Sequence, residues 1–103
     1  MRMIKQVSDA IRKNIHEAHE KIEMAYRLYD TDKGVADWYK EMAAAHLAFN
    51  ENGHKNVTRL IDHAKTTKAD NPMMPGMIAA YNEIHASLKR ETAEVQAMIQ
   101  NYK

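Results

Sequence analysis

Apolar side chains recur along most of the chain at steps of three or four residues, the spacing that places them on one face of an α-helix. The first run ends at the turn-forming segment Asp30-Thr31-Asp32-Lys33-Gly34. Thr31 or Asp32 is expected to cap the next helix, because its side-chain oxygen can accept from free backbone N–H groups. The apolar stripe of the first run comprises Ile4, Val7, Ile11, Ile15, Ala18, Ile22, Ala25 and Tyr29.

The second run has an apolar stripe that keeps its phase across a glycine. Asn52-Gly53 is typical of a turn and would split this run into two helices, giving a four-helix up-down bundle. A glycine inside a helix costs only about 1 kcal/mol relative to alanine, so one long helix is favoured. The stripe expected to face the core comprises Val35, Trp38, Met42, Ala45, Phe49, Gly53, Asn56, Leu60 and Ala64, with Trp38 as its anchor near the first turn.

The third run follows two prolines, Pro72 and Pro75, which fall where a helix starts or a loop turns. The whole chain has only 3 Gly and 2 Pro, too few turn residues for a β-rich domain of this size. Short connections between long helices make neighbours antiparallel. The sequence therefore predicts one all-α domain over residues 1–103, an antiparallel bundle of three long helices at about residues 3–30, 33–68 and 75–103.

A second set of apolar residues follows the middle run, well to one side of the main stripe: Ala36, Tyr39, Ala43, Leu47, Val57 and Ile61. A single three-helix bundle is expected to expose this seam, and soluble monomers seldom expose a large contiguous apolar patch. The seam therefore predicts a homodimer. Its interface is expected to contain Met24, Leu28, Leu47, Val57 and Ile61. Scattered surface apolar residues are the alternative interpretation.

Composition narrows the possible functions. Of the 103 residues, 45% are hydrophobic and 28% are charged, which is typical of a globular protein. The absence of Cys excludes disulfides, thiolate-bound zinc, iron–sulfur clusters and covalently attached haem. With 15 basic and 14 acidic residues the chain lacks the basic excess of a nucleic-acid binder. No run approaches the roughly 20 apolar residues of a membrane span, and the N-terminus lacks an apolar leader, so a cytoplasmic location is expected.

Histidine placement gives the one candidate for a metal site. His16, His19, Glu20 and Glu23 project from one helical face. An antiparallel neighbour is expected to bring His46 opposite His19. Together His19, Glu23 and His46, with His16 as a further ligand, could hold a divalent transition metal such as Zn, Fe, Ni or Cu. The alternative is a solvated face with charge pairs one turn apart and a hydrogen-bonded His46.

Motifs for catalysis are missing. Glu51 and His54 form one Glu-x-x-His, whereas di-iron carboxylate bundles need two such motifs and two further Glu, so no family is claimed. The chain has no Gly-rich phosphate loop for a nucleotide and no recognisable nucleophile. The sequence thus favours a self-associating protein-interaction module, with a protein partner or a second copy as ligand. The alternative is a divalent-metal-binding helical bundle of ferritin-like character.

Overall fold

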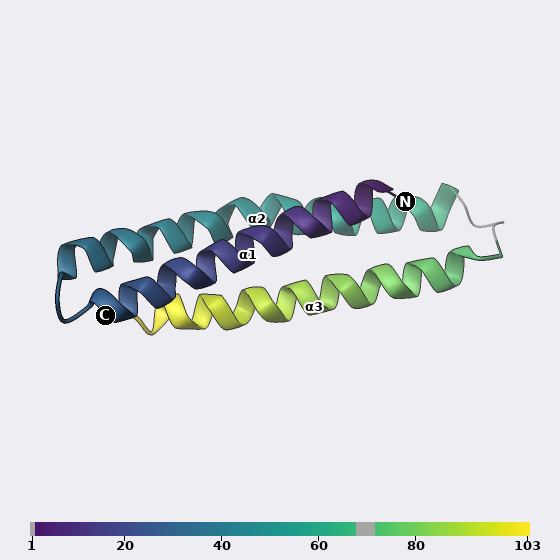
Figure 1. Ribbon diagram of the computed structural model, residues 1–103. Coiled ribbons are helices and arrows are strands. Elements are labelled where there is room, and N and C mark those ends of the chain that lie inside the picture. The colour runs from purple at the N-terminus through teal and green to yellow at the C-terminus, as the bar shows by residue number, and fades with distance from the viewer. Residues whose placement is uncertain (1, 68–71) are drawn as a thin grey trace.

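Three long helices make up the bundle. The computed structural model describes residues 2–67 and 72–103, which contain α1 (Arg2–Leu28), α2 (Lys33–Thr67) and α3 (Met74–Gln100). The helices alternate in direction along the chain, so α1 and α3 run parallel (Figure 1). The predicted all-α bundle of three helices is confirmed, and α2 is continuous through Asn52 and Gly53. The expected end of the second helix, residue 68, lies outside the described residues.

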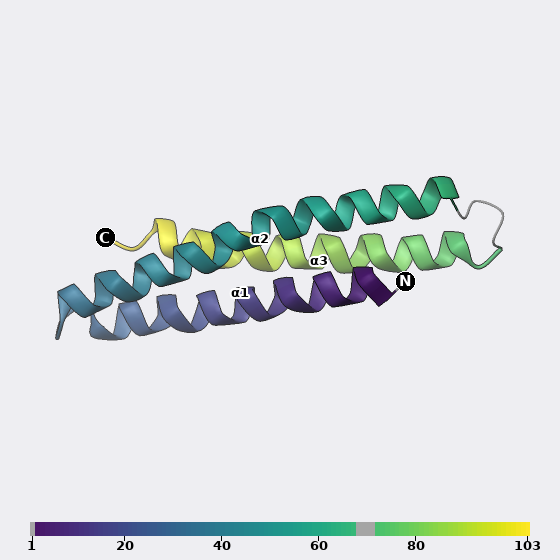
Figure 2. The same cartoon turned by 90° about the horizontal axis from the view of Figure 1, so that it is seen from above.

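The bundle is a slender rod. Its Cα atoms extend 60 × 17 × 16 Å, as expected when a helix of 35 residues sets the length. Seen from above, the end of α3 reaches the same end of the rod as the turn between α1 and α2 (Figure 2). Within the described residues, no helix is long and apolar enough to cross a membrane.

Asp32 caps the start of α2. Its Oδ1 accepts from the backbone N of Val35 at 3.2 Å, and its carbonyl accepts from the N of Ala36 at 2.9 Å. The neighbouring Thr31 instead donates its hydroxyl to the carbonyl of Leu28 at 3.4 Å. Of the two expected caps, Asp32 is therefore the one that satisfies the free N–H groups of α2.

The core follows the predicted stripe of α1. It follows that of α2 only toward the C-terminal end of the helix, where Ala64 is buried and Leu60 packs against the core. Trp38 and Phe49, expected inside, are 56% and 76% exposed, and Val35 is 39% exposed. The seam expected on the surface forms the α2 side of the core instead. The core cluster comprises Ile4, Ile11, Ile15, Ala18, Ile22 and Ala25 of α1, Ala43, Leu47, Val57 and Ile61 of α2, and Leu88, Val95 and Ile99 of α3.

The prediction that a single chain exposes Leu47, Val57 and Ile61, and so presents them to a second copy, is wrong. A single chain buries them, at 8%, 0% and 2% exposure. Met24 and Leu28, expected beside them, are half-buried. The physical reason is that α1 and α2 meet along small residues, and the seam rich in alanine fits that approach better than the seam with Trp38 and Phe49.

Close contact between the first two helices occurs at Gly53. A Cβ atom built there would lie 2.8 Å from Cγ1 of Ile11, a side chain that is itself only 2% exposed. Gly53 therefore does not mark a turn. It removes a side chain where the α1 surface leaves no room for one, and this advantage outweighs the poor helix propensity of glycine.

Tyrosines fasten the end of α3 to the turn between α1 and α2. The ring of Tyr102 meets those of Tyr26 and Tyr29 edge-on, with centroids 5.7 and 5.4 Å apart. Its hydroxyl donates to Oδ1 of Asp37 at 2.6 Å, and Lys33 Nζ donates to the same oxygen at 2.6 Å. These two donors hold the pKa of Asp37 below its usual value, with the Lys33 hydrogen bond as the larger cause.

Replacing Gly53 with Ala tests the close approach. We expect Gly53→Ala to lower the free energy of unfolding by about 1–2 kcal/mol, because overpacking against Ile11 exceeds the gain in helix propensity. The matched control is Gly76→Ala in the first turn of α3, where an added Cβ meets no atom within 4 Å. Urea unfolding should show opposite signs for the two variants. Equal stabilisation by both would contradict a tight contact at Gly53.

Candidate functional site

The proposed metal ligands of α1 form pairs within that helix. His16 Nε2 lies 2.9 Å from Glu20 Oε1, and His19 Nε2 lies 3.0 Å from Glu23 Oε1. The side chains are between 40% and 68% exposed, so these are surface contacts of modest strength. This matches the alternative interpretation, in which this face carries charge pairs one turn apart.

His46, the expected third ligand, has a different partner. Its Nδ1 lies 3.2 Å from Oδ1 of Asn14 on α1, so the hydrogen-bonded alternative describes it. Among the described residues, no group of three or more His, Cys, Asp and Glu side chains could hold a metal ion together. His19 and Glu23 thus supply two neighbouring ligands, and the structure does not bring His46 into that pair.

A short chain of polar side chains connects α1 and α2 beside Gly53. Asn50 is 2% exposed, and its Nδ2 donates to the carbonyl of Ile11 at 3.1 Å. Asn14 Nδ2 donates to Asn50 Oδ1 at 3.2 Å, while its Oδ1 faces His46. These hydrogen bonds satisfy the buried amide of Asn50 inside an otherwise apolar contact. They also fix the register of the two helices, because each amide has one correct partner.

Removing Asn14 should leave Asn50 Oδ1 without its donor. We expect Asn14→Ala to reduce the free energy of unfolding by about 1–3 kcal/mol, the usual cost of an unsatisfied buried polar group. Asn52→Ala, at an exposed position of α2, serves as the control and should change stability by less than about 0.5 kcal/mol. Thermal melts of both variants provide the measurement. Equal stability of the two would show that the Asn14 contact contributes nothing.

Two histidines lie between α2 and α3. The rings of His54 and His85 stack at 5.5 Å between centroids with 29° between planes, and His85 is only 8% exposed. His54 Nε2 lies 3.3 Å from the hydroxyl of Thr92. Burial, aided by the charge of Lys89, lowers the pKa of both rings. The bundle therefore favours the neutral form of each imidazole.

Stability should consequently fall in mild acid. The unfolded chain takes up protons near pH 6.5, the ordinary His value, while the folded chain resists them, so protonation favours unfolding. The contribution of this pair is constant above about pH 6.5 and declines as pH falls toward the lower folded pKa values. Urea unfolding at pH 7.5 and 5.0 should show a smaller loss for His54→Gln than for the original chain. Asn52→Ala, at an exposed site of α2, removes no titratable group, so it is the control and should leave the loss unchanged.

An apolar stripe remains on the outer face of α2. Val35, Met42 and Phe49 follow one another at heptad spacing, and Trp38 and Ala45 fill the intervening positions. Met42 is half-buried and the other four are exposed. Phe49 is 76% exposed and lies at the edge of the stripe that borders α1, where it lines a shallow hollow with Gln6, Val7, Ala10 and Asn14 of α1. The sequence did contain this stripe, but its large side chains suggested a core.

Comparison with known protein families, with curated proteins and with solved structures finds no match to this chain.

Proposed function

We propose that this protein is a self-associating helical interaction module, in which a second copy docks on the outer face of α2. The observation that supports it is the exposure of Phe49 and Trp38, at 76% and 56%, on one stripe of a long helix. Each exposed ring presents apolar area whose removal from water favours association by about 25 cal/mol for every Å². Trp and Phe are both enriched at interfaces between proteins relative to the rest of the surface.

Small residues allow two copies of α2 to approach each other. Ala45 lies on the stripe one turn before Phe49, and Ala44 and Ala48 are exposed on the adjoining surface of α2. Helices that meet at alanines can approach closely, leaving space for a bulky side chain from the opposite helix. If the two copies run antiparallel, the two Phe49 rings lie on either side of the symmetry axis and each can pack over the alanines of the other copy.

Charge favours the same arrangement. Glu41 lies one heptad before Ala48 and Lys55 one heptad after it, so all three share one edge of the stripe. Both charged side chains are exposed, and neither forms an ion pair within the described chain. An antiparallel pair with its axis near Ala48 sets Glu41 of each copy opposite Lys55 of the other. A second copy of this chain is therefore the partner whose charges fit.

A charge-swap series tests this arrangement. The original chain should sediment at about twice its 11.9 kDa mass. Glu41→Lys and Lys55→Glu should each weaken the dimer, because each creates two like-charge contacts across the axis. Mixing the two single variants should restore association, since the mixed dimer regains opposite charges at both contacts. Sedimentation velocity at low salt, where exposed charges are least screened, gives the clearest readout.

Two further variants separate the charges from the apolar anchor. Phe49→Glu should give a monomer with unchanged helix content, because this side chain contributes little to the core. Ala93→Glu, at an exposed position of α3, adds the same charge elsewhere and should leave the dimer intact. A monomeric original chain at high concentration would refute the proposal, and so would a dimer that survives Phe49→Glu.

A further inference from the structure

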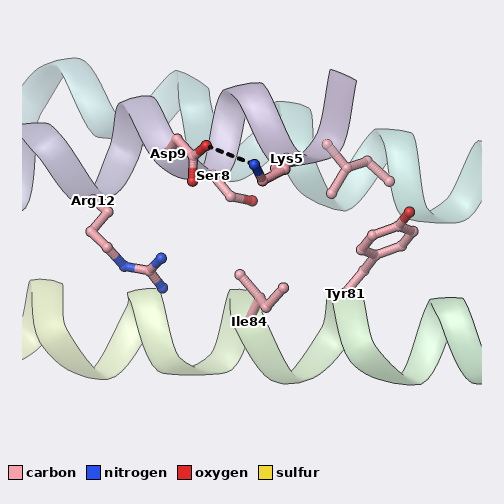
Figure 3. A pocket seen from close by; sticks show the side chains of 7 residues that line it. Lys5, Ser8, Asp9, Arg12, Tyr81 and Ile84 are labelled. Carbon is pink, nitrogen blue, oxygen red and sulfur yellow. Dashed lines mark ion pairs between the residues drawn. The ribbon is translucent and has the colours of Figure 1, made fainter. Parts of the chain in front are cut away.

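A hollow of about 540 Å³ lies between α1 and α3 (Figure 3). No residue of α2 lines it, so it is separate from the exposed stripe of that helix. Its size falls within the roughly 300–1,000 Å³ of typical small-molecule sites. Its residues come from the first three turns of α1 and from the first half of α3. They are Ile4, Lys5, Ser8, Asp9, Arg12, Tyr81 and Ile84.

A polar atom without a partner lies at the back of this hollow. Ser8 is 4% exposed, yet its Oγ has no hydrogen-bond partner in the described structure. A helical serine usually satisfies its hydroxyl on the carbonyl of the preceding turn. Figure 3 shows the hydroxyl of Ser8 pointing into the space between the two helices. A buried hydroxyl left in this way costs free energy, which a ligand oxygen placed there would recover.

Positive charge gathers beside that hydroxyl. Arg12 lies one turn after Ser8 on the same face of α1, and its guanidinium reaches across the hollow toward α3 (Figure 3). It forms no ion pair with any described residue. The acidic residue of the hollow, Asp9, lies 4.0 Å from Lys5 Nζ. Glu91 and Glu94 of α3 line the neighbouring hollow with Arg12 but form no ion pair with it in the described residues. Because Lys5 balances Asp9, Arg12 supplies the unpaired positive charge of the hollow itself.

The other end of the hollow is apolar. Ile4 is 1% exposed, and Ile84 rises from α3 with 37% of its surface exposed. Tyr81 lies one turn before Ile84 and directs its ring toward α1 (Figure 3). From Ile4 to Arg12 the hollow follows about 12 Å of the α1 axis, at 1.5 Å for each residue. It therefore has a cationic end with a hydroxyl, and an apolar end.

We propose that this hollow binds a small amphipathic carboxylate. The carboxylate lies between the guanidinium of Arg12, which can donate two parallel hydrogen bonds, and the hydroxyl of Ser8. The hydrocarbon part lies along Ile4, Tyr81 and Ile84, where it covers the exposed surface of Ile84. This site is independent of self-association through α2, since the two surfaces have no residue in common.

Titration calorimetry with octanoate, acetate and octanol tests the proposal. Octanoate should bind at least roughly tenfold more tightly than acetate, which lacks the tail, and than octanol, which lacks the charge. Arg12→Gln should weaken octanoate binding by roughly 10- to 100-fold, the range for a hydrogen bond to a charged group. Lys13→Gln removes a neighbouring exposed cation outside the hollow and should leave the affinity unchanged.

Ile84→Asn separates the apolar end from the charged one. It should weaken octanoate binding but leave the weak binding of acetate unaltered. Because Arg12, Lys13 and Ile84 are exposed, each variant should fold, and circular dichroism checks this. The proposal is overturned if octanoate binds no better than acetate, if Arg12→Gln and Lys13→Gln have equal effects, or if Ile84→Asn leaves octanoate affinity unchanged. None of these outcomes depends on whether the protein is a dimer.

Discussion

The close approach of α1 to α2 is the constraint on which the rest of the structure depends. Gly53 lies against Ile11 with no room for a Cβ, and fully buried alanines, Ala18, Ala25 and Ala43, continue the contact along the two helices. Helices this close cannot hold an indole or a phenyl ring between them. Trp38 and Phe49 of α2 are therefore exposed on the surface. α3 packs on the α1–α2 pair with the larger side chains of Leu88, Val95 and Ile99.

Hydrophobic spacing was sufficient to predict the three helices, their approximate ends and the buried stripe of α1. It failed to choose between the two apolar seams of α2, because both have the period of a helix. Side-chain size favoured the seam with Trp38 and Phe49, whereas packing selected the seam with Ala36 and Ala43. The distance between the backbones of α1 and α2 decides which side-chain sizes fit between them. That distance depends on the residues of both helices. Gly53, which lies against Ile11, was the one residue in the sequence that indicated how closely the two helices approach.

The candidate sites also contain some contacts that the sequence predicts and others that depend on the assembled bundle. Contacts within one helix, such as His19 with Glu23, follow from spacing alone. Contacts between α1 and α2 require the register. The loop length predicted that His46 meets His19, whereas His46 meets Asn14, more than one turn away along α1. The hollow between α1 and α3 depends on two helices that no short connection joins. Nothing in the sequence relates Ser8 and Arg12 to Tyr81 and Ile84 until the whole bundle is assembled.

The parallel direction of α1 and α3 has an electrostatic consequence. Each helix carries a macrodipole with partial positive charge at its N-terminus. The dipole of α2 opposes the parallel dipoles of α1 and α3 but offsets only about one of them, so the bundle retains roughly the dipole of one helix along its axis. The first turns of α1 and α3 contain no acidic residue that would offset their positive ends. In the proposed antiparallel pair of chains, the two residual dipoles oppose each other, whereas a parallel pair would add them. The backbone itself thus favours the direction of pairing in which Glu41 meets Lys55.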